Sequence, residues 1–422
     1  MLGCYGKNMG GIMRTATGKV LPLLICVMAW LISTGPAHSA ILVNAPMTDN
    51  NSSGWVMGGN PNSAILTGNG TIDPVGSGWL RLTNNSINQT GFAYNNTAFD
   101  LSAGVLIQFD YATWGGTGAD GYSVYLFDAN VPTFNIGAFG GSLGYAQMSA
   151  SPAACYHAPS NVPGISGGYV GIGVDEYGNF AWGCEGRYLG AASRIPNTVT
   201  IRGSVGGFGG GAVGSTQGTT SYPLISTSAN NGSLWYNGAP RPDQFSGNYR
   251  KVIIRISPAP NPVADVWVQF GYNTPPVQMI SGQALPAISA SQQLKIGYAA
   301  STGGSTNYHE IRNLLITSVN ASTSIDLGVT KTAVTSGTTT PITGVLVGNT
   351  FQYLITARNY GPNSITATGV GITDNFPAAI TPGTWTCAAG NGASCGAASG
   401  SGNLNTTANL PRYGSVTYRV TA

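Results

Sequence analysis

The sequence predicts an all-β protein built from β-sandwiches. Short stretches rich in β-branched and aromatic residues recur along the chain, and Gly, Asn or Pro bounds each of them. No window shows a sustained apolar period of 3.6 residues, which is the pattern of an amphipathic helix. Glycine supplies 62 of the 422 residues, yet 42% are hydrophobic and 9% aromatic, which is enough to bury a core and argues against a disordered chain.

The first 40 residues are typical of a secretory signal peptide. Basic residues precede an apolar run over 20–32, and small residues then offer a cleavage site after Ser39 or Ala40. An uncleaved membrane anchor is the alternative, but the run is short for crossing a bilayer. No later segment is apolar enough to do so, and we expect a secreted or cell-surface protein without a membrane span.

Loss of this leader removes three basic residues and no acidic one. The whole chain has 17 basic and 14 acidic residues, so the mature chain has 14 of each and no net charge. A balanced chain lacks the basic surface that tracks phosphates, and we therefore expect no nucleic-acid partner.

Cysteine usage agrees with an oxidising compartment. Four cysteines remain after the leader: Cys155, Cys184, Cys387 and Cys395. They permit three pairings, of which the sequential one, within each predicted domain, is the simplest. Zinc is the competing interpretation, but no pair has the two-to-four-residue spacing of zinc ligands.

The region 41–320 predicts a two-sheet sandwich, because some of its strands partly alternate apolar and polar residues. Its clearest predicted strands cover residues 104–114, 121–129, 168–178, 197–204, 250–258, 263–272, 292–301 and 308–317. A Gly/Ser/Thr-rich stretch over 206–220 predicts a long flexible loop within the sandwich.

A smaller β unit is predicted over 325–422. Its last segment, GSVTYRVTA, predicts a strand that ends without a closing turn. An edge strand of this kind normally pairs with a further strand, so we expect the unit to be incomplete at Ala422 and further domains of the same polypeptide to follow.

Four segments beside predicted strands are rich in glycine or polar residues: GGTGADGYSVYLFD (115–128), GAFGGSLGY (137–145), GIGVDEYGNF (171–180) and GYAASTGGSTNYHEI (297–311). Each has an ordinary interpretation when taken alone. An Asp before Gly is typical of a turn, and the glycines after Phe139 do not precede a helix, so they do not predict a phosphate-binding loop.

Taken in order, these segments resemble the L-type lectin family over residues 41–318. The resemblance implies a concanavalin-like jelly-roll of antiparallel sheets that binds sugar in a shallow cup beside loops held by Ca²⁺. The carbohydrate-binding residues that it implies are Asp120, Gly140, Gly141, Tyr177, Asn179, Gly303 and Gly304. Asp120 would accept hydrogen bonds from sugar hydroxyls, often after a cis Ala119–Asp120 peptide. Gly140 or Gly141 would offer a backbone N–H.

The same resemblance implies the metal ligands Asp175, Tyr177, Asn179 and Glu185. Carboxylate, amide and main-chain oxygens are the ligands that Ca²⁺ prefers. The chain departs from the family pattern at Gly173 and Gly183, where acids are expected, and Glu185 is only the nearest acid. We therefore expect no transition-metal site.

The second unit resembles the conserved-repeat immunoglobulin-like modules of bacterial surface proteins (the domain-of-unknown-function eleven family). The resemblance covers 326–422 and rests on FQYLITARNYGPNSITATGVGITDNFPAAI, TWTCAAGNGASC and LPRYGSVTYRV. It implies a small immunoglobulin-like β-sandwich that serves as a stalk or spacer.

Catalysis is disfavoured by the placement of the acids. A glycosidase needs two carboxylates flanking one bond, but Asp175 and Glu176 are neighbours on a strand and point to opposite faces. The G-x-S-x-G sequences of the chain, such as GGSLG (140–144), do not precede a predicted helix, which a nucleophile elbow requires. We predict a carbohydrate-binding protein with glycan partners and no enzymatic activity. The alternatives are an envelope protein that keeps the fold without binding sugar, and a glycoside hydrolase.

Overall fold

The chain is all-β, as predicted. The structure, a computed structural model, describes residues 40–150, 161–204, 221–242, 246–272, 274–319, 327–342, 344–359 and 366–422. Over these ranges it has 23 strands and two short 3-10 helices, η1 (Gly140–Ser142) and η2 (Cys184–Gly186). The described residues contain no helix long and apolar enough to cross a membrane.

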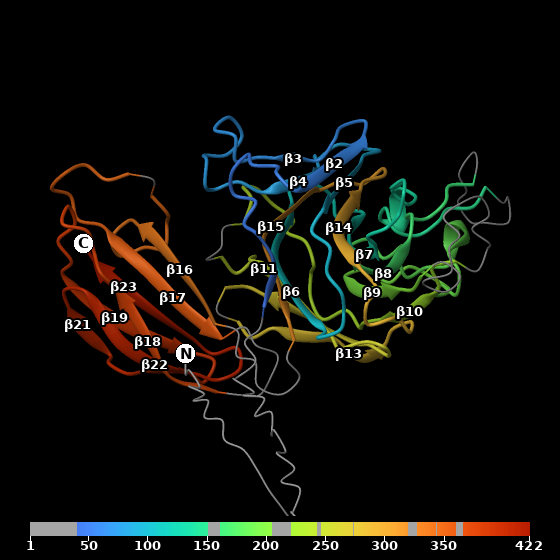
Figure 1. Cartoon of the computed structure of the whole chain (residues 1–422). Coiled ribbons are helices and arrows are strands. Elements are labelled where there is room, and N and C mark those ends of the chain that lie inside the picture. The colour runs from blue at the N-terminus through green and yellow to red at the C-terminus, as the bar shows by residue number, and fades with distance from the viewer. Residues whose placement is uncertain are drawn as a thin grey trace, which may run out of the picture. The chain divides into compact units, whose positions relative to one another are not determined.

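The strands between Ile41 and Ser318 form two antiparallel sheets (Figure 1). The eight-stranded sheet has the order β13 (Val277–Ala284), β12 (Val263–Phe270), β11 (Arg250–Ile256), β6 (Val105–Trp114), β15 (Tyr308–Ser318), β4 (Leu80–Thr83) and β3 (Ile65–Leu66), with β1 (Ile41–Ala45) also paired to β15. The seven-stranded sheet has the order β10 (Leu224–Thr227), β9 (Thr198–Arg202), β8 (Gly168–Asp175), β7 (Gly121–Asp128), β14 (Leu294–Ser301), β5 (Thr90–Asn95) and β2 (Trp55–Asn60).

Aromatic side chains from both sheets meet in one buried core. Phe109 of β6 packs edge-on against Tyr298 of β14 and Tyr122 of β7, with ring centroids 5.1 and 6.2 Å apart. All three side chains are buried. The eight segments predicted as strands in this region are strands, which confirms the sandwich. The loop predicted over 206–220 lies outside the described residues.

The two sheets approach closely where β5 passes β4. A Cβ built on Gly91 of β5 would lie 1.7 Å from the carbonyl oxygen of Leu82 in β4, so only glycine fits. Gly91 pairs with Ala300 of β14, so the close approach lies beside the end of that strand.

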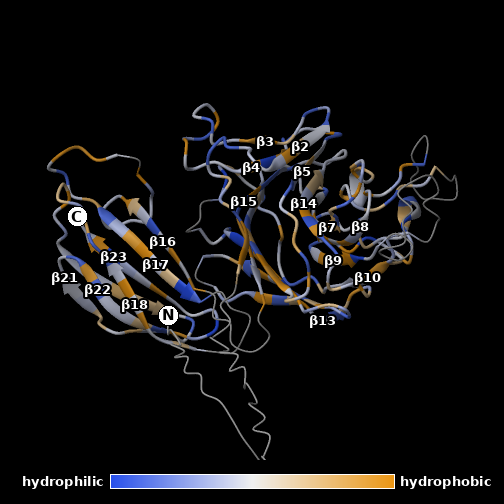
Figure 2. Cartoon of the chain, viewed as in Figure 1, coloured by the Kyte–Doolittle hydropathy of each residue, from blue (hydrophilic) through white to orange (hydrophobic). Residues whose placement is uncertain are grey.

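The strands after Leu327 form two further sheets. The five-stranded sheet has the order β16 (Leu327–Val334), β17 (Gln352–Asn359), β23 (Ser415–Thr421), β19 (Thr384–Gly390) and β21 (Ser399–Ser401). The three-stranded sheet has the order β18 (Ala367–Asp374), β22 (Leu404–Leu410) and β20 (Ser394–Cys395). Strand β17 is hydrophobic in its middle and hydrophilic at its ends (Figure 2).

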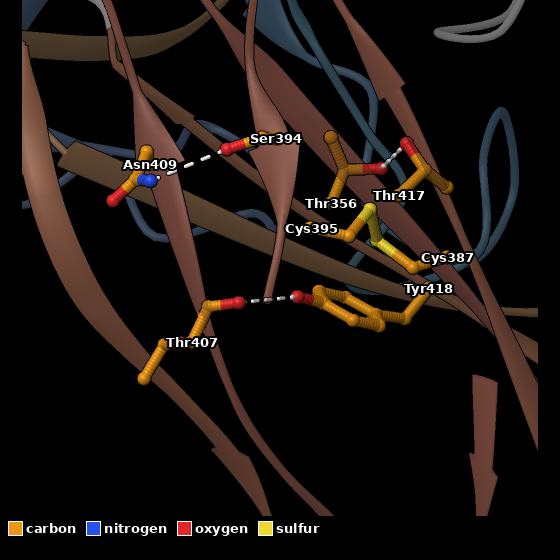
Figure 3. Close-up of a disulfide and its surroundings, with 8 residues drawn as sticks. All are labelled: Thr356, Cys387, Ser394, Cys395, Thr407, Asn409, Thr417 and Tyr418. Atoms are coloured by element: carbon orange, nitrogen blue, oxygen red, sulfur yellow. Dashed lines mark hydrogen bonds between the residues drawn. A yellow bond between two sulfur atoms is a disulfide. The ribbon is translucent and has the colours of Figure 1, made fainter. Parts of the chain in front are cut away.

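A disulfide joins these two sheets (Figure 3). Cys387 of β19 is bonded to Cys395 of β20, which confirms the pairing predicted for these cysteines. The Tyr418 hydroxyl of β23 donates to the carbonyl oxygen of Thr407 in β22 at 3.4 Å and links the same sheets. Cys184 is also disulfide-bonded, and its predicted partner Cys155 lies outside the described residues.

The prediction that the final strand forms an open edge is wrong. Strand β23 lies inside its sheet, where it pairs with β17 on one side and β19 on the other. The second partner of β23, Thr384–Gly390, is not among the strands predicted from the sequence, so this pairing was not expected.

The Gly91 contact predicts a stability effect. Gly91→Ala would force a methyl group into the Leu82 backbone, and overpacking of this kind costs about 1–3 kcal/mol or more. We expect a lower midpoint in urea unfolding of the mature protein. Gly247→Ala is the control, because a Cβ there meets nothing within 4 Å. Equal midpoints for the two variants would contradict the packing argument.

Candidate functional site

Three neighbouring strands of the seven-stranded sheet bring the predicted site residues to one edge. Asp120 immediately precedes β7, Asp175 ends β8 and Ser301 ends β14. The register pairs Ser301 with Gly121 and Val174 with Tyr122, so the three positions lie side by side. Antiparallel pairing thus brings together residues as far apart in the chain as Asp120 and Ser301.

Ser301 connects the loops around this edge. Its carbonyl oxygen accepts the Asp120 N–H at 2.9 Å, and its hydroxyl oxygen accepts the Gly140 N–H at 2.7 Å. The hydroxyl itself donates to the carbonyl oxygen of Gln89 at 3.0 Å. The Ala119–Asp120 peptide is cis, as the resemblance implied. The loop of Asp120 and the glycine-rich turn are therefore held by one residue.

The Asp120 carboxyl group is buried but not satisfied by the protein. Its residue is 5% exposed, and Oδ2 accepts no hydrogen bond from the described residues. Burial raises the pKa of this carboxyl to about 8, with further contributions from the charges of Asp175, Glu185 and Glu176. An unpaired buried oxygen carries a desolvation cost, which a ligand that donates a hydrogen bond would relieve.

Asp175 shapes the loop that follows β8. Its Oδ1 accepts the Gly178 N–H at 2.8 Å, and its Oδ2 accepts the Phe180 N–H at 2.7 Å. Burial raises the pKa of Asp175 to about 7, although these two hydrogen bonds oppose the shift. The Tyr177 N–H in the same loop donates to the carbonyl oxygen of Asp120 at 3.2 Å. The Asp175 carboxyl group therefore shapes the loop, and the Tyr177 N–H holds this loop against the Asp120 segment.

Asn179 lies against the glycine-rich turn. A Cβ built on Gly141 would come within 2.2 Å of the Asn179 Cβ, so the absence of a side chain at 141 makes this contact possible. The amide oxygen Oδ1 of Asn179 is buried and accepts no hydrogen bond from the described residues. The site thus contains a second unsatisfied oxygen.

Gly303 borders the Asp120 carboxyl group. A Cβ built there would lie 3.9 Å from both carboxyl oxygens, while one built on Gly304 would meet nothing within 4 Å. The Tyr177 ring, predicted to stack on sugar, has the exposed Arg194 guanidinium 4.3 Å from its centroid. One face of that ring is therefore already covered.

Glu185 is buried and paired. Its carboxylate forms a close ion pair with Arg187, whose side chain has no exposed surface. Gly183, which stands at a position where the resemblance implies a metal-binding acid, leads directly into this segment. The Glu185 carboxylate, which the resemblance implies as a metal ligand, is thus already paired with the Arg187 guanidinium.

The neighbouring acid, Glu176, faces the interior of the sandwich. It accepts a hydrogen bond from the Asn307 amide at 2.5 Å and lies 3.4 Å from His309 Nε2. His309 Nδ1 is 2.6 Å from the Thr83 hydroxyl. Asp175 and Glu176 therefore hold different partners, in agreement with the prediction that they point to opposite faces.

The predictions missed Ser301 and Arg187, and also Ser142, whose hydroxyl oxygen accepts a hydrogen bond from Arg187 Nη1. Ser301 stands in the AASTGG segment, but nothing in that segment distinguishes its role from that of an ordinary strand end. Arg187 offered a signal that was not used, because a cation is unusual in a glycine-rich segment of a chain with only 7% charged residues. A buried cation beside predicted ligand positions is a reason to examine charge balance there.

Comparison with known proteins gives a likeness in structure only. No protein-family model and no curated protein matches the chain. Similar solved structures include the Ca²⁺/Man-bound exoplasmic/lumenal domain of VIP36 (14% identical, 68% of this chain and 93% of that chain, TM-score 0.40) and lectin II from Ulex europaeus (14%, 66% and 97%, TM-score 0.40). Peanut lectin with a 9mer peptide is also similar (17%, 67% and 97%, TM-score 0.39). Such low identities and TM-scores assign neither ligand nor metal to this chain.

The two hydrogen bonds of Asp175 predict a local effect of its removal. Asp175→Ala leaves the Gly178 and Phe180 N–H groups without their acceptor, and a lost buried hydrogen bond costs about 1–3 kcal/mol. We expect these two amides to exchange with solvent deuterium on the order of tenfold faster or more. Asp49→Ala is the control, since Asp49 accepts the Asn51 N–H in an exposed turn. Unchanged exchange at 178 and 180 would show that the loop is held otherwise.

Proposed function

We propose that this protein binds carbohydrate at the edge formed by β7, β8 and β14. The observation that carries the proposal is a pair of buried oxygens, Asp120 Oδ2 and Asn179 Oδ1, that accept no hydrogen bond from the described residues. Both lie beside glycine residues, Gly303 and Gly141, which present no side chain. Sugars present many hydroxyl donors and apolar C–H faces, which suit oxygen acceptors and open glycine-rich turns.

Each residue has a distinct part in this proposal. Asp120 accepts hydrogen bonds from sugar hydroxyls, and Asn179 contributes its amide group. The Gly140 N–H already donates to Ser301, so we assign to Gly141 the main-chain N–H that faces the sugar. Gly303 leaves room over the Asp120 carboxyl group, and the loop that contains Gly303 and Gly304 sets the preference for one sugar over another.

The rest of the chain supports a role outside the cytoplasm. The signal-peptide pattern and the Cys387–Cys395 disulfide both favour an oxidising compartment. We propose glycans or glycoconjugates at a cell surface as partners, with residues 325–422 acting as a spacer of immunoglobulin-like type. Because the predicted mature chain has no net charge, it suits a neutral ligand better than a polyanion.

Calcium, which the resemblance implies, fits these residues poorly. Both oxygens of Asp175 already accept main-chain N–H groups, and Glu185 is paired with Arg187. The described residues contain no cluster of three or more His, Cys, Asp or Glu side chains placed to hold a metal. Ca²⁺ takes six to eight oxygen ligands, and among the implied ligands only Asn179 Oδ1 is a buried side-chain oxygen without a hydrogen bond to the described residues. We therefore assign no step of binding to calcium.

Asp120→Asn tests the proposed acceptor. The substitution keeps the shape but replaces a carboxyl oxygen by an NH₂ group, and leaving a buried hydrogen-bonding group without its partner costs about 1–3 kcal/mol. We expect affinity for the best ligand on a glycan array to fall on the order of tenfold to a hundredfold. Asp128→Asn, at the other end of β7, is the matched control and should bind like the wild type. A well-folded wild-type protein that binds no glycan would refute the proposed function.

Gly303→Val tests the open space over Asp120. A Cβ at this position would lie 3.9 Å from both carboxyl oxygens with nothing nearer, and the methyl groups of valine would extend over them. We expect at least about a tenfold loss of affinity with an unchanged thermal midpoint, because the ligand and not the fold loses space. Gly247→Val should retain binding, since a Cβ there meets nothing within 4 Å and the residue is not part of the proposed site. Equal affinities for both variants would place the ligand elsewhere.

A further inference from the structure

The Arg187 guanidinium lies buried between the two loops that flank the proposed sugar site. Nε donates to the carbonyl oxygen of Trp182 at 3.0 Å, and Nη1 donates to the Ser142 hydroxyl oxygen at 3.0 Å. Nη1 also pairs with Glu185. Ser142 ends the glycine-rich turn, and the Trp182 N–H donates to the carbonyl oxygen of Asn179. One guanidinium therefore connects the turn of Gly141 with the loop of Asn179.

Arg187 is also the cation that offsets the carboxyl groups of this site. Its positive charge lowers the pKa of both Asp120 and Asp175, in opposition to their burial. One of its three nitrogens, Nη2, is buried and donates no hydrogen bond to the described residues. A buried donor without a partner costs free energy, so this guanidinium is kept in the interior at a cost to stability.

A divalent metal could do the same two tasks, since it would join loops and neutralise acids. In this protein Arg187 already joins the two loops and already pairs with an acid. A guanidinium also occupies a fixed place with a fixed charge, because arginine does not lose its proton in proteins. A metal ion placed beside it would be repelled at close range in a medium of low dielectric constant.

We infer that Arg187 is the resident cation and positioning residue of this site, so that carbohydrate binding does not require a divalent metal. The inference rests on the proposed function. The hydrogen bonds of Arg187 to the carbonyl oxygen of Trp182 and to the Ser142 hydroxyl oxygen keep the segments of Asn179 and Gly141 at a fixed separation.

The first test needs no substitution. Affinity of the mature wild-type protein for its best array glycan is measured by titration calorimetry in EDTA and again in excess CaCl₂, and Tb³⁺ luminescence reports metal binding directly. We expect the two affinities to agree within about twofold and no saturable Tb³⁺ signal. Loss of binding in EDTA would overturn the inference while leaving the proposed function intact. No glycan binding in either buffer would instead refute the proposed function.

The second test removes the guanidinium without leaving an unpaired acid. In the double variant Glu185→Gln/Arg187→Gln both members of the buried pair become neutral, so folding is less threatened than in Arg187→Gln alone. We expect at least about a tenfold weaker affinity that added guanidinium ion partly restores and added Ca²⁺ does not. Lys331→Gln/Asp374→Asn, which removes an ion pair between β16 and β18, is the control and should bind like the wild type. Wild-type affinity in Glu185→Gln/Arg187→Gln, or rescue by Ca²⁺, would overturn the inference.

Discussion

The candidate site depends on the hydrogen bonds of one buried residue at the end of β14. Ser301 holds the Asp120 segment through its carbonyl oxygen and the glycine-rich turn through its hydroxyl oxygen. Its place is fixed by the pairing of β14 with β7 on one side and β5 on the other. The register of the seven-stranded sheet therefore determines the distance between the Asp120 segment and the glycine-rich turn. A slip of one residue would turn Ser301 to the other face and separate them.

Backbone contacts of glycine make this arrangement compact. Gly91 allows β5 to approach the backbone of β4, and Gly141 allows the turn to touch Asn179. A high glycine content, which in isolation suggests disorder, here removes side chains from places where two segments meet. The loops are pliable in composition but fixed by specific partners, as the hydrogen bonds of Asp175 to Gly178 and Phe180 show.

Much of the fold followed from local pattern, whereas the site followed only in part. The strands of the large sandwich were predictable because β-branched runs between turn residues carry their own signal. The place of β23 was not, because pairing with Thr384–Gly390 depends on contacts distant in sequence. Asp120, Asn179 and Gly303 were selected from the order of their motifs, and the structure brings their segments together. Arg187 and Ser301 were missed, since burial and hydrogen bonding give a charged or polar residue its role only after folding.

The distribution of charge is the strongest reason to regard this edge as functional. Only 14 acids occur in the chain, yet Asp120, Asp175, Glu176 and Glu185 are close enough for the last three to raise the pKa of the first. Burying carboxyl groups together costs stability, and well-packed apolar residues would serve a purely structural role better. The cost is offset in part by Arg187, by main-chain N–H groups and by Asn307, each of which neutralises or hydrogen-bonds one of the acids. Asp120 Oδ2 still lacks a hydrogen bond from the described residues, and a donor from outside the protein would complete it.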